Sequence, residues 1–194
     1  MEIVLRDGQQ VASSLFRKKG DLGLTSNYRG ITLTPIAAKV YNLLNLNRIR
    51  PTLEKILRPN QNGFRPNRST TGQILTIRRL IEGIKSQNLK AVLTFVDFTK
   101  AFDTIHRGKM KEILEAYGIP SKITAAIMML YTKTKSMVRS PDGDTDFFEI
   151  LAGVLQGDTL APFIFIICLD YALRLSADSN KNLGLILTLS RSSR

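Results

Sequence analysis

Asp97 is the residue of this sequence that is best placed for metal chemistry. It follows directly on the apolar run from Ala91 to Val96, and the β-branched and aromatic residues of that run predict a buried strand. A carboxylate at the end of such a strand lies where the sheet meets solvent, and there it can hold a hard cation. A carboxylate in this place also serves as a simple strand-end cap, so the pattern alone leaves two roles open for Asp97.

The positive charge of the chain is concentrated in its first half. Residues 1–90 hold 16 Lys and Arg against 5 Asp and Glu, whereas residues 91–194 hold 12 against 11. Because neutralisation of phosphates by basic side chains drives nucleic-acid binding, this asymmetry favours a polyanion as the partner. Attraction to an anionic membrane surface and simple solubility are the two other interpretations.

The composition excludes several classes of protein and site. The chain has 194 residues, 43% of them hydrophobic, which suffices for the core of one domain or of part of a larger one. One cysteine, Cys168, and one histidine, His106, exclude disulfide frameworks and metal sites rich in these residues. We expect Cys168 to be a small buried hydrophobe and His106 to be a loop residue or a helix cap. The longest apolar stretch is too short to span a bilayer and no signal peptide is visible, so we expect an intracellular protein, cytoplasmic or nuclear, without a membrane partner.

The first half of the chain predicts short strands followed by two helices. Residues 1–33 predict short strands separated by turns. Thr34 and Pro35 are a good cap and first-turn pair for a helix that runs to about Arg50, where Pro51 interrupts or kinks it. Residues 60–68 predict a loop. Ser69 or Thr70 can cap a second helix, whose apolar face would be Ile74, Ile77, Leu80, Ile81 and Ile84.

The second half predicts three helices and a hairpin after the strand that ends at Asp97. A helix from Arg107 to Tyr117 is stopped by Gly118, and Ser121 caps the next helix, which ends near residue 132. Residues 135–140 and 146–150 flank a turn-rich connection that is typical of a hairpin. The last helix, residues 161–176, is apolar almost all round at its start and should be buried. Together these elements predict an α+β fold.

Four segments of the chain resemble signature blocks of one enzyme family. Residues 95–103 read FVDFTKAFD and residues 153–162 read GVLQGDTLAP. These two blocks resemble those of reverse transcriptases, most closely those of non-LTR retrotransposons. RKKGD at 17–21 with NYRGI at 27–31 is similar to the fingers hairpin of the family, with Gly30 in place of a commoner proline, and QNGFRPNRS at 61–69 is similar to its QxGFRxxRS block. The four blocks occur in the family's order and cover about residues 15–175.

The resemblance implies a catalytic role for the first of these blocks. In the family, the residue matched by Asp97 is a metal ligand, and the backbone carbonyl at the position of Phe98 is another. Phe102 matches the residue that packs beneath the sugar of the incoming nucleotide and favours deoxyribose over ribose, although it could also be a core aromatic. The backbone N–H groups of Lys100 and Ala101 would lie along the triphosphate. For the neighbouring carboxylate, Asp103, we expect a structural capping role.

The other blocks imply contacts with the nucleotide and with nucleic acid. Arg29 would bind the triphosphate through both arms of its guanidinium. Gln156 and Gly157 match the pair that packs against the incoming base and its template partner, and Asp158 is expected to cap the helix that follows. The expected phosphate and nucleic-acid contacts are Lys18, Lys19, Arg65 and Arg68.

The fold implied by the resemblance is a right-hand polymerase, with fingers and part of a palm. Residues 1–88 and 121–152 would form fingers, residues 89–120 and 153–176 palm, and residues 177–194 a tail. The family's third block, an Asp-Asp pair on a hairpin, has no match before Arg194. Asp170, in a helix, and Asp178, in the polar tail, are not expected to replace it.

The expected activity of the family is RNA-directed DNA polymerisation. It extends a DNA primer on an RNA template with deoxynucleoside triphosphates and two Mg²⁺ ions. Without the Asp-Asp pair, we expect this chain to be an inactive fragment that holds at most one weak Mg²⁺. The alternative is a non-catalytic RNA- or DNA-binding protein derived from a retroelement. A relative of RNA-templated RNA polymerases is disfavoured, because Phe102 would clash with ribose.

Overall fold

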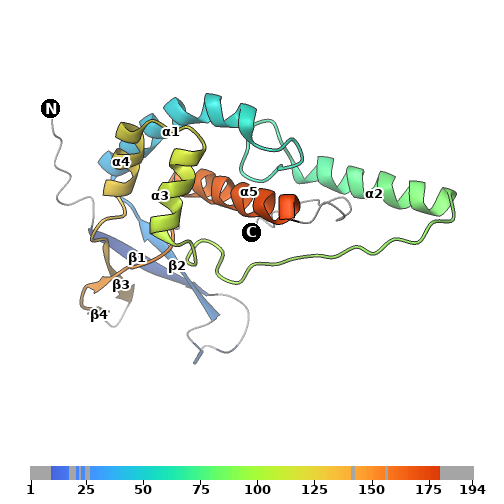
Figure 1. The fold of residues 1–194 in the computed structure, drawn as a ribbon. Helices are drawn as coiled ribbons and strands as arrows, with labels where there is room; N and C mark the ends of the chain where they lie inside the picture. Colours follow the sequence, from blue (N-terminus) through green and yellow to red (C-terminus); the bar gives the residue numbers. More distant parts are fainter. Residues whose placement is uncertain are drawn as a thin grey trace. The chain divides into compact units, whose positions relative to one another are not determined.

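The structure, a computed structural model, describes residues 10–17, 21, 23–24, 27–140, 143–155 and 157–179. Figure 1 shows the order of the elements along the chain. The strands are β1 (Gln10–Arg17), β2 (Tyr28–Leu33), β3 (Lys135–Ser140), β4 (Gly143–Asp144) and β5 (Phe148–Glu149). The helices are α1 (Ile36–Ile56), α2 (Thr70–Ser86), α3 (Arg107–Ala116), α4 (Ser121–Met129) and α5 (Ala161–Ser179).

The chain forms two compact units. The first unit comprises Met1–Ile56 and Lys100–Cys168, and the second comprises Leu57–Thr99 and Leu169–Arg194. Helix α5 contributes its first half to the first unit and its second half to the second. These units divide the chain at other places than the predicted division into fingers and palm, which stays a prediction.

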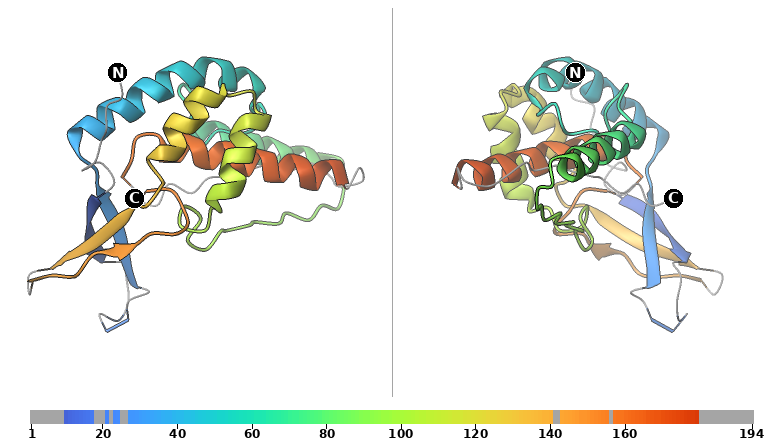
Figure 2. Two further views of the ribbon diagram at one scale, coloured as in Figure 1. Left: turned by 60° about the vertical axis from the view of Figure 1, so that its left-hand side comes forward. Right: turned by 90° about the vertical axis from the view of Figure 1, so that its right-hand side faces the viewer.

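A small mixed sheet belongs to the first unit. The strand order is β2-β1-β3-β4, and β5 also pairs with β3. β1 runs antiparallel to β2, with Arg17 opposite Tyr28, and parallel to β3, with Gln10 opposite Lys135. Figure 2 shows the sheet to one side of α1, α3 and α4 in both views, which is the segregated arrangement of an α+β fold. The predicted fold class is therefore observed.

The core of the first unit lies between its helices. Helix α5 begins with a stretch that is buried on nearly every side, as its sequence predicts, and α1, α3 and α4 contribute one face each. Burial of each such side chain stabilises the fold by about 1.5–3 kcal/mol. The most deeply buried apolar residues of this core are Leu46, Leu53, Met110, Leu114, Ile127, Leu160, Phe163, Ile164, Ile166 and Ile167.

Helix α1 runs through Pro51, so the prediction that Pro51 interrupts the helix is wrong. The helix continues to Ile56. A proline removes one backbone N–H and leaves the carbonyl four residues earlier without its helical partner. Both Pro51 and that residue, Asn47, are exposed, and water can therefore satisfy the carbonyl. Ile49 and Leu53 are buried on the opposite face and hold the helix in place on both sides of the proline.

Most of the predicted helix ends are observed. The Ser69 side chain caps α2 by accepting from Gly72 N, and His106 caps α3 by accepting from Lys109 N. Gly118, with φ of 76°, follows the end of α3, in the left-handed conformation that glycine adopts at little cost. Ser121 is the first residue of α4 and not its cap, and that helix ends at Met129.

The predicted hairpin and last helix differ from the structure in detail. β3 pairs with two short strands, β4 and β5, where one strand over 146–150 was expected. Residues 141–142 of the predicted connection lie outside the described residues. Helix α5 extends to Ser179, three residues beyond its predicted end.

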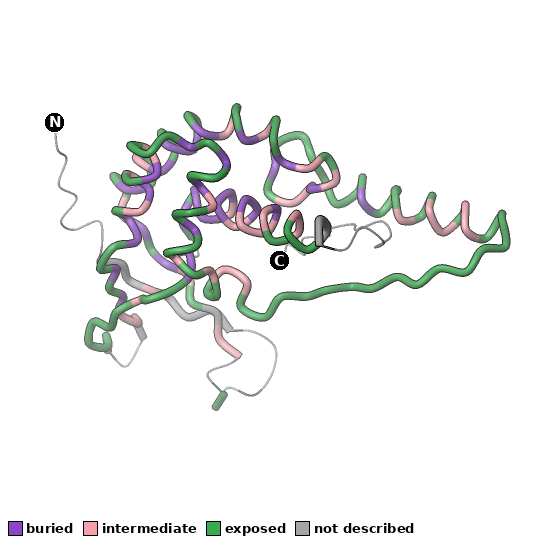
Figure 3. Tube along the Cα trace, viewed as in Figure 1, coloured by how far each residue is buried: buried purple, intermediate pink, exposed green. Residues whose placement is uncertain are grey.

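The strand predicted for residues 91–96 is absent, and this prediction is wrong. Residues 89–98 are exposed throughout, and the exposed fraction of the Val92 side chain reaches 92%. Figure 3 shows this segment as a continuous exposed stretch. A sequence pattern reports the preference of a segment for extended, buried backbone, whereas a strand exists only where a second strand supplies its hydrogen bonds. Asp97 therefore ends an unpaired extended segment.

The buried interior of the second unit is small and mostly polar. The buried residues among those described there are Leu57, Gln61, Arg65, Gln73 and Asp170. The predicted apolar face of α2 is only half-buried, and Ile74 at its start is 61% exposed. This unit therefore presents apolar side chains that none of its described residues covers.

Candidate nucleotide and nucleic-acid site

The turn after Asp97 exposes backbone donors, as expected for an anion site. Lys100 has a φ of 51°, and its carbonyl accepts from Asp103 N at 2.8 Å and from Thr104 N at 3.2 Å. The N–H groups of Lys100 and Ala101 donate to no acceptor among the described residues. Two neighbouring backbone donors in such a turn can bind a phosphate oxygen.

Phe102 is held in place by an aromatic neighbour. Its ring stacks on Phe165 of α5, with 4.8 Å between the ring centroids and an angle of 25° between the planes. It is half-buried. The stacking fixes the orientation of the ring, while the exposed part of the side chain stays available for contact with a sugar, so the core role and the gate role are compatible.

The 153–158 loop is joined directly to the turn that carries Phe102. Val154 N donates to the carbonyl of Phe102, and Gly153 N donates to the carbonyl of Ile105, both at 2.8 Å. Gly153 has a φ of 80°, and a Cβ added to it would lie 2.6 Å from the Cα of Asp103. Because glycine alone has no Cβ, only glycine permits this approach of two backbones. The end of the 95–103 block and the start of the 153–162 block therefore meet in the first unit.

The same loop also approaches strand β2. A Cβ on Gly157, which has a φ of 105°, would lie 2.5 Å from the carbonyl oxygen of Thr32. Strand β2 carries Arg29, whose backbone pairs with Phe16 of β1. The structure thus brings together the backbone of three predicted segments: β2, the turn around Phe102 and the loop around Gly157.

Several predicted site residues lie outside the described part of the structure. Lys18, Lys19 and Gln156 are among them, as is the side chain of Arg29. Asp97 and Phe98 belong to the second unit, whereas Phe102 and Gly157 belong to the first. Convergence of Asp97, Phe102, Gln156 and Arg29 on one cleft therefore stays a prediction.

Asp158 anchors the loop to the helices beneath it. It is buried, with an exposed fraction of 4%, and its carboxylate accepts from Asn42 Nδ2 at 2.5 Å, Leu160 N at 3.3 Å and the Tyr131 hydroxyl at 3.4 Å. Helix α5 begins at Ala161, and the bond to Leu160 N lies in the turn before it, so Asp158 supports that turn and is not the predicted helix cap. Burial raises the pKa of Asp158, and burial together with the charge of Asp158 raises the pKa of Tyr131 well above its ordinary value.

Arg107 connects the segments that lead into this loop. Its guanidinium donates to the carbonyls of Tyr131 at 2.6 Å, Ile150 at 2.7 Å and Gly153 at 3.1 Å, and it lies 5.4 Å from the centroid of the Tyr131 ring. Burial lowers the pKa of Arg107, although a guanidinium keeps its charge in proteins. One side chain thus fixes the end of α4, the segment after β5 and the start of the 153–158 loop.

Sequence reasoning missed the roles of Arg107, Asn42 and Tyr131. A signal existed for Asn42. It shares a helical face with Ala38, Leu46 and Ile49, all of them buried, and a polar residue at a position where the period requires an apolar one indicates a buried hydrogen bond. No comparable signal marks Arg107, which is an ordinary basic residue at the first position of a helix.

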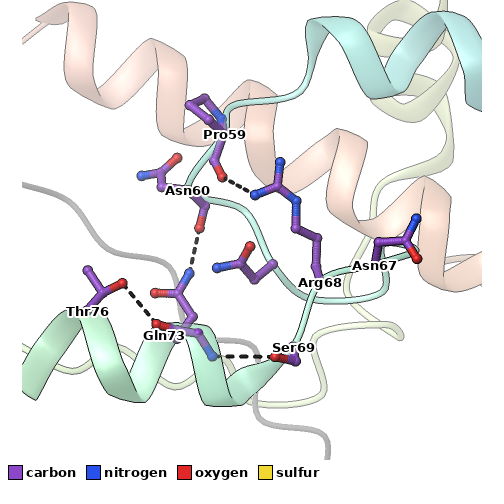
Figure 4. A pocket seen from close by; sticks show the side chains of 9 residues that line it. Pro59, Asn60, Asn67, Arg68, Ser69, Gln73 and Thr76 are labelled. Atoms are coloured by element: carbon purple, nitrogen blue, oxygen red, sulfur yellow. Dashed lines mark hydrogen bonds between the residues drawn. The ribbon is translucent and has the colours of Figure 1, made fainter.

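A polar pocket lies in the second unit, between the 59–69 loop and the first turns of α2. It has a volume of about 380 Å³, and Figure 4 shows its lining. Arg68 donates to the carbonyl of Pro59 at 3.2 Å, and Gln73 Nε2 donates to the carbonyl of Asn60 at 2.7 Å. The lining combines amides, hydroxyls and one guanidinium: Pro59, Asn60, Asn62, Asn67, Arg68, Ser69, Gly72, Gln73 and Thr76.

Arg65 and Arg68 were both predicted to contact phosphates, but they differ in exposure. Arg68 is exposed at the pocket. Arg65 is buried, with an exposed fraction of 7%, and its Nη1 donates to the carbonyls of Arg58 at 2.8 Å and Gln61 at 3.0 Å. Since a buried guanidinium that is engaged by carbonyls is not free to meet a phosphate, Arg65 shapes the loop. The phosphate role of Arg68 stays a prediction.

Comparison with known proteins agrees with this geometry. The family model described as reverse transcriptase (RNA-dependent DNA polymerase) matches residues 16–187. The chain belongs to this family. The predicted resemblance to reverse transcriptases is thereby confirmed, and the relatives described next are encoded by mobile elements, in agreement with the predicted likeness to non-LTR retrotransposons.

Relatives of the chain are encoded by retrotransposable elements of animals. A Pol polyprotein of the type-1 element R2 of Popillia japonica is 28% identical over 81% of this chain. The putative 115 kDa protein of the element R1DM of Drosophila melanogaster is 28% identical over 77% of it, and the 149 kDa protein of transposon TX1 of Xenopus laevis is 24% identical over 81%. The chain spans 22%, 14% and 12% of the lengths of these three proteins.

A solved structure with a similar fold is apo telomerase from Candida tropicalis, truncated from its C-terminal domain. The match covers 94% of this chain and 42% of the telomerase chain, with a TM-score of 0.60 and 15% identity. The prediction of a polymerase-like α+β fold for this reverse transcriptase chain is confirmed.

The described residues of this reverse transcriptase chain do not complete a two-metal site. Within these residues, no three His, Cys, Asp or Glu side chains gather where they could hold one ion. Asp97 and the carbonyl of Phe98, the two predicted ligands, would supply one carboxylate and one neutral oxygen, whereas the chemistry of two metal ions needs bridging carboxylates. Asp170 carries an ion pair with Arg58 and another with Arg174, which explains its burial.

Two further expectations concern residues outside the site. Cys168 is half-buried and not buried as expected, although burial is sufficient to raise the pKa of its thiol to about 12. Among the helices of the described part of the chain, none is long and apolar enough to cross a membrane.

Proposed function

We propose that this chain carries the nucleotide- and template-binding part of a retroelement RNA-directed DNA polymerase, and that residues 1–194 on their own do not catalyse polymerisation. The observation that carries the proposal is the junction of β2, the Phe102 turn and the Gly157 loop in the first unit. In this proposal, Arg29 and the N–H groups of Lys100 and Ala101 bind the triphosphate. Phe102 packs beneath the sugar, and Gln156 and Gly157 pack against the base pair. The natural metal of such enzymes would be Mg²⁺, for which this chain offers Asp97 and Phe98.

The assignment of segments to fingers and palm is part of the same proposal. Residues 1–88 and 121–152 serve as fingers and residues 89–120 and 153–176 as palm. The pocket between Arg68 and Gln73 supports the assignment of the 59–76 region to template contact, because its amides and its guanidinium are the groups that meet phosphates and base edges. The proposed partners are an RNA template, a DNA primer and deoxynucleoside triphosphates.

Binding of nucleic acid gives the first test. A labelled RNA–DNA primer-template is titrated with the chain at 50 and 200 mM salt, and fluorescence anisotropy gives Kd. Arg68→Gln is expected to weaken binding several-fold and to reduce the dependence of Kd on salt, because one phosphate contact is lost. Arg79→Gln, which removes an exposed charge from α2 outside the pocket, is the matched control and should change Kd by less than about twofold.

An equal effect of the two substitutions would show that binding senses overall charge and not the pocket. Binding that does not depend on salt would leave the basic half of the chain as a determinant of solubility only.

Primer extension gives the second test. The purified chain should extend no primer above background with Mg²⁺ or Mn²⁺ and all four deoxynucleotides. A single carboxylate cannot bridge two ions, and loss of that stabilisation lowers the rate by roughly a thousandfold or more. An active reverse transcriptase in a parallel reaction checks the substrate.

Extension that is abolished by Asp97→Ala would overturn the proposed inactivity, and Asp178 would then be the first carboxylate to examine as its partner. Binding without extension is the result that we expect. It would leave a non-catalytic nucleic-acid-binding protein, the alternative derived from the sequence, as the accurate description of this chain alone.

A further inference from the structure

Arg107 is a charged side chain that is half-buried beside neutral partners. Its Nε donates to the carbonyl of Gly153 at 3.1 Å, and its Nη1 donates to the carbonyls of Tyr131 at 2.6 Å and Ile150 at 2.7 Å. Among the described residues, none of its partners is a carboxylate, and its Nη2 is buried without a partner. Burial of a charge costs free energy that carbonyls offset only in part. Stability alone therefore does not account for an arginine at this place, and exceptions of this kind are typical of functional sites.

Gly153 is bonded on both sides to the segment that follows Phe102. Its N–H donates to the carbonyl of Ile105 at 2.8 Å, and its own carbonyl accepts from Arg107 Nε. The next residue, Val154, donates to the carbonyl of Phe102 at 2.8 Å. Two of these three bonds join backbone groups, and the bond from Arg107 is made by a side chain. A substitution can therefore remove the Arg107 bond and leave the backbone groups in place.

Arg107 also fixes the direction in which the 153–158 loop leaves the preceding segment. It bonds the chain at Ile150 and again at Gly153, directly before the loop. Further along the loop, Gly157 lies against β2, where an added Cβ would be 2.5 Å from the carbonyl oxygen of Thr32. The position of Gly157 therefore depends on β2 on one side and on the bonds of Arg107 on the other.

We propose that Arg107 is a positioning residue for nucleotide selection, because it fixes the spacing between the Phe102 ring and the loop around Gly157. The inference rests on the proposed function, in which Phe102 packs beneath the sugar and Gly157 packs against the base pair. A nucleotide that is held by its base then presents its sugar to the ring at a fixed distance, so that a 2′-hydroxyl collides with the ring and a hydrogen does not. A misplacement of about 1 Å in such a site can cost roughly 10²-fold. Arg107 itself does not touch the nucleotide in this arrangement.

Arg107→Lys separates the charge of this side chain from its geometry. In lysine a methylene group takes the place of Nε, and the ammonium group lies near the position of the guanidinium carbon. The variant therefore keeps the positive charge and a donor near the carbonyls of Tyr131 and Ile150, but it has no donor for the carbonyl of Gly153.

Calorimetric titration of the chain bound to an RNA–DNA primer-template tests the effect on selection. With a template cytosine at the next position, Kd is measured for dGTP and for GTP in the presence of Mg²⁺. The unaltered chain should bind dGTP more tightly, and Arg107→Lys should reduce the ratio of the two Kd values at least about fivefold. Ile127→Val is the matched control. It lowers stability by trimming a fully buried side chain of α4, removes none of the bonds of Arg107, and should leave the ratio unchanged.

The outcomes separate this inference from the proposed function. If Arg107→Lys weakens the binding of dGTP and GTP in equal proportion, or leaves both unchanged, Arg107 does not act on selection and the inference is overturned alone. Equal binding of the two nucleotides by the unaltered chain would contradict the proposed role of Phe102, and the inference would be overturned with it.

Amide hydrogen exchange tests the same bond without any nucleotide. In Arg107→Lys, the amides of Gly153 and Val154 should exchange at least about tenfold faster, because the loop loses one point of attachment. The amide of Leu114, a fully buried residue of α3, should change by less than about twofold. Unchanged exchange at Gly153 would overturn the inference. Equally faster exchange at all three residues would also overturn it, because it would show a loss of global stability in place of a local change.

Discussion

Gly153→Ala is expected to be among the most destabilising substitutions in the chain. The added Cβ would lie 2.6 Å from the Cα of Asp103 and 2.7 Å from the carbonyl oxygen of Phe102, and backbone cannot move aside as a flexible side chain can. The φ of 80° adds strain for any residue with a Cβ. Together, the overpacking and the strain should lower the free energy of unfolding by about 3 kcal/mol or more, measured by urea denaturation followed by circular dichroism.

Gly30→Ala is the matched control for this experiment. Gly30 also belongs to the first unit, but a Cβ added there meets nothing within 4 Å. Its free energy of unfolding should stay within about 0.5 kcal/mol of that of the unaltered chain. Equal stabilities of Gly153→Ala and Gly30→Ala would contradict the close contact between the Phe102 turn and the 153–158 loop, on which the proposed nucleotide site depends.

Asp170→Asn is expected to have an effect of similar size in the second unit. The carboxylate is 2% exposed and accepts from Arg58 Nε at 2.8 Å and from Arg174 Nε at 2.7 Å. Replacement by an uncharged amide leaves two guanidinium groups facing each other without an anion. Removal of one partner from a fully buried ion pair typically costs about 3–5 kcal/mol. Because the Arg58 and Arg174 side chains are 19% and 40% exposed, solvent screens part of this interaction, and we expect a loss near the lower end of that range, about 3 kcal/mol at most. Thermal or urea unfolding of the chain measures it.

An exposed ion pair provides the comparison. Glu82→Gln removes the partner of Arg79 on α2, where both side chains are more than half exposed. Such pairs contribute about 0.5 kcal/mol or less, so this substitution should be nearly silent. If Asp170→Asn also left the free energy of unfolding unchanged, Asp170 would not stabilise the fold, and a catalytic role for it would have to be reconsidered.

Local signals predicted the parts of the site that depend on local chemistry. Ser69 and His106 cap their helices because their side chains bond backbone N–H groups three residues on. Helix α3 ends before Gly118 because glycine adopts the left-handed conformation at little cost. The Phe102 turn is also closed by local bonds, from Asp103 and Thr104 to the carbonyl of Lys100 three and four residues earlier, although the sequence indicated this turn only through the family resemblance. In each of these elements the interacting groups lie within a few residues of one another, so the sequence alone identifies them.

Contacts between distant segments could not be predicted in the same way. Arg107 meets carbonyls of residues 24 to 46 positions away, and no pattern specifies which carbonyls these are. The extended run at 91–96 shows the converse case. The residue types of this run favour a buried strand. The run itself cannot specify which other segment would pair with it, and no described residue does so. The continuation of α1 through Pro51 likewise depends on the exposure of Asn47, which only the folded structure reveals.

The parallel pairing of β1 with β3 has a consequence for the synthesis of the chain. The Ser13 and Ser136 hydroxyls are 2.9 Å apart in the sheet, although 123 residues separate them along the sequence. β2 can pair with one edge of β1 soon after both leave the ribosome, but the other edge must wait for β3, for roughly 5–20 s at ordinary rates of translation. During this interval the nascent chain exposes an open strand edge, and non-local pairing of this kind also slows refolding. Chaperones that cover such edges should therefore govern the yield of this protein more strongly than its final stability does.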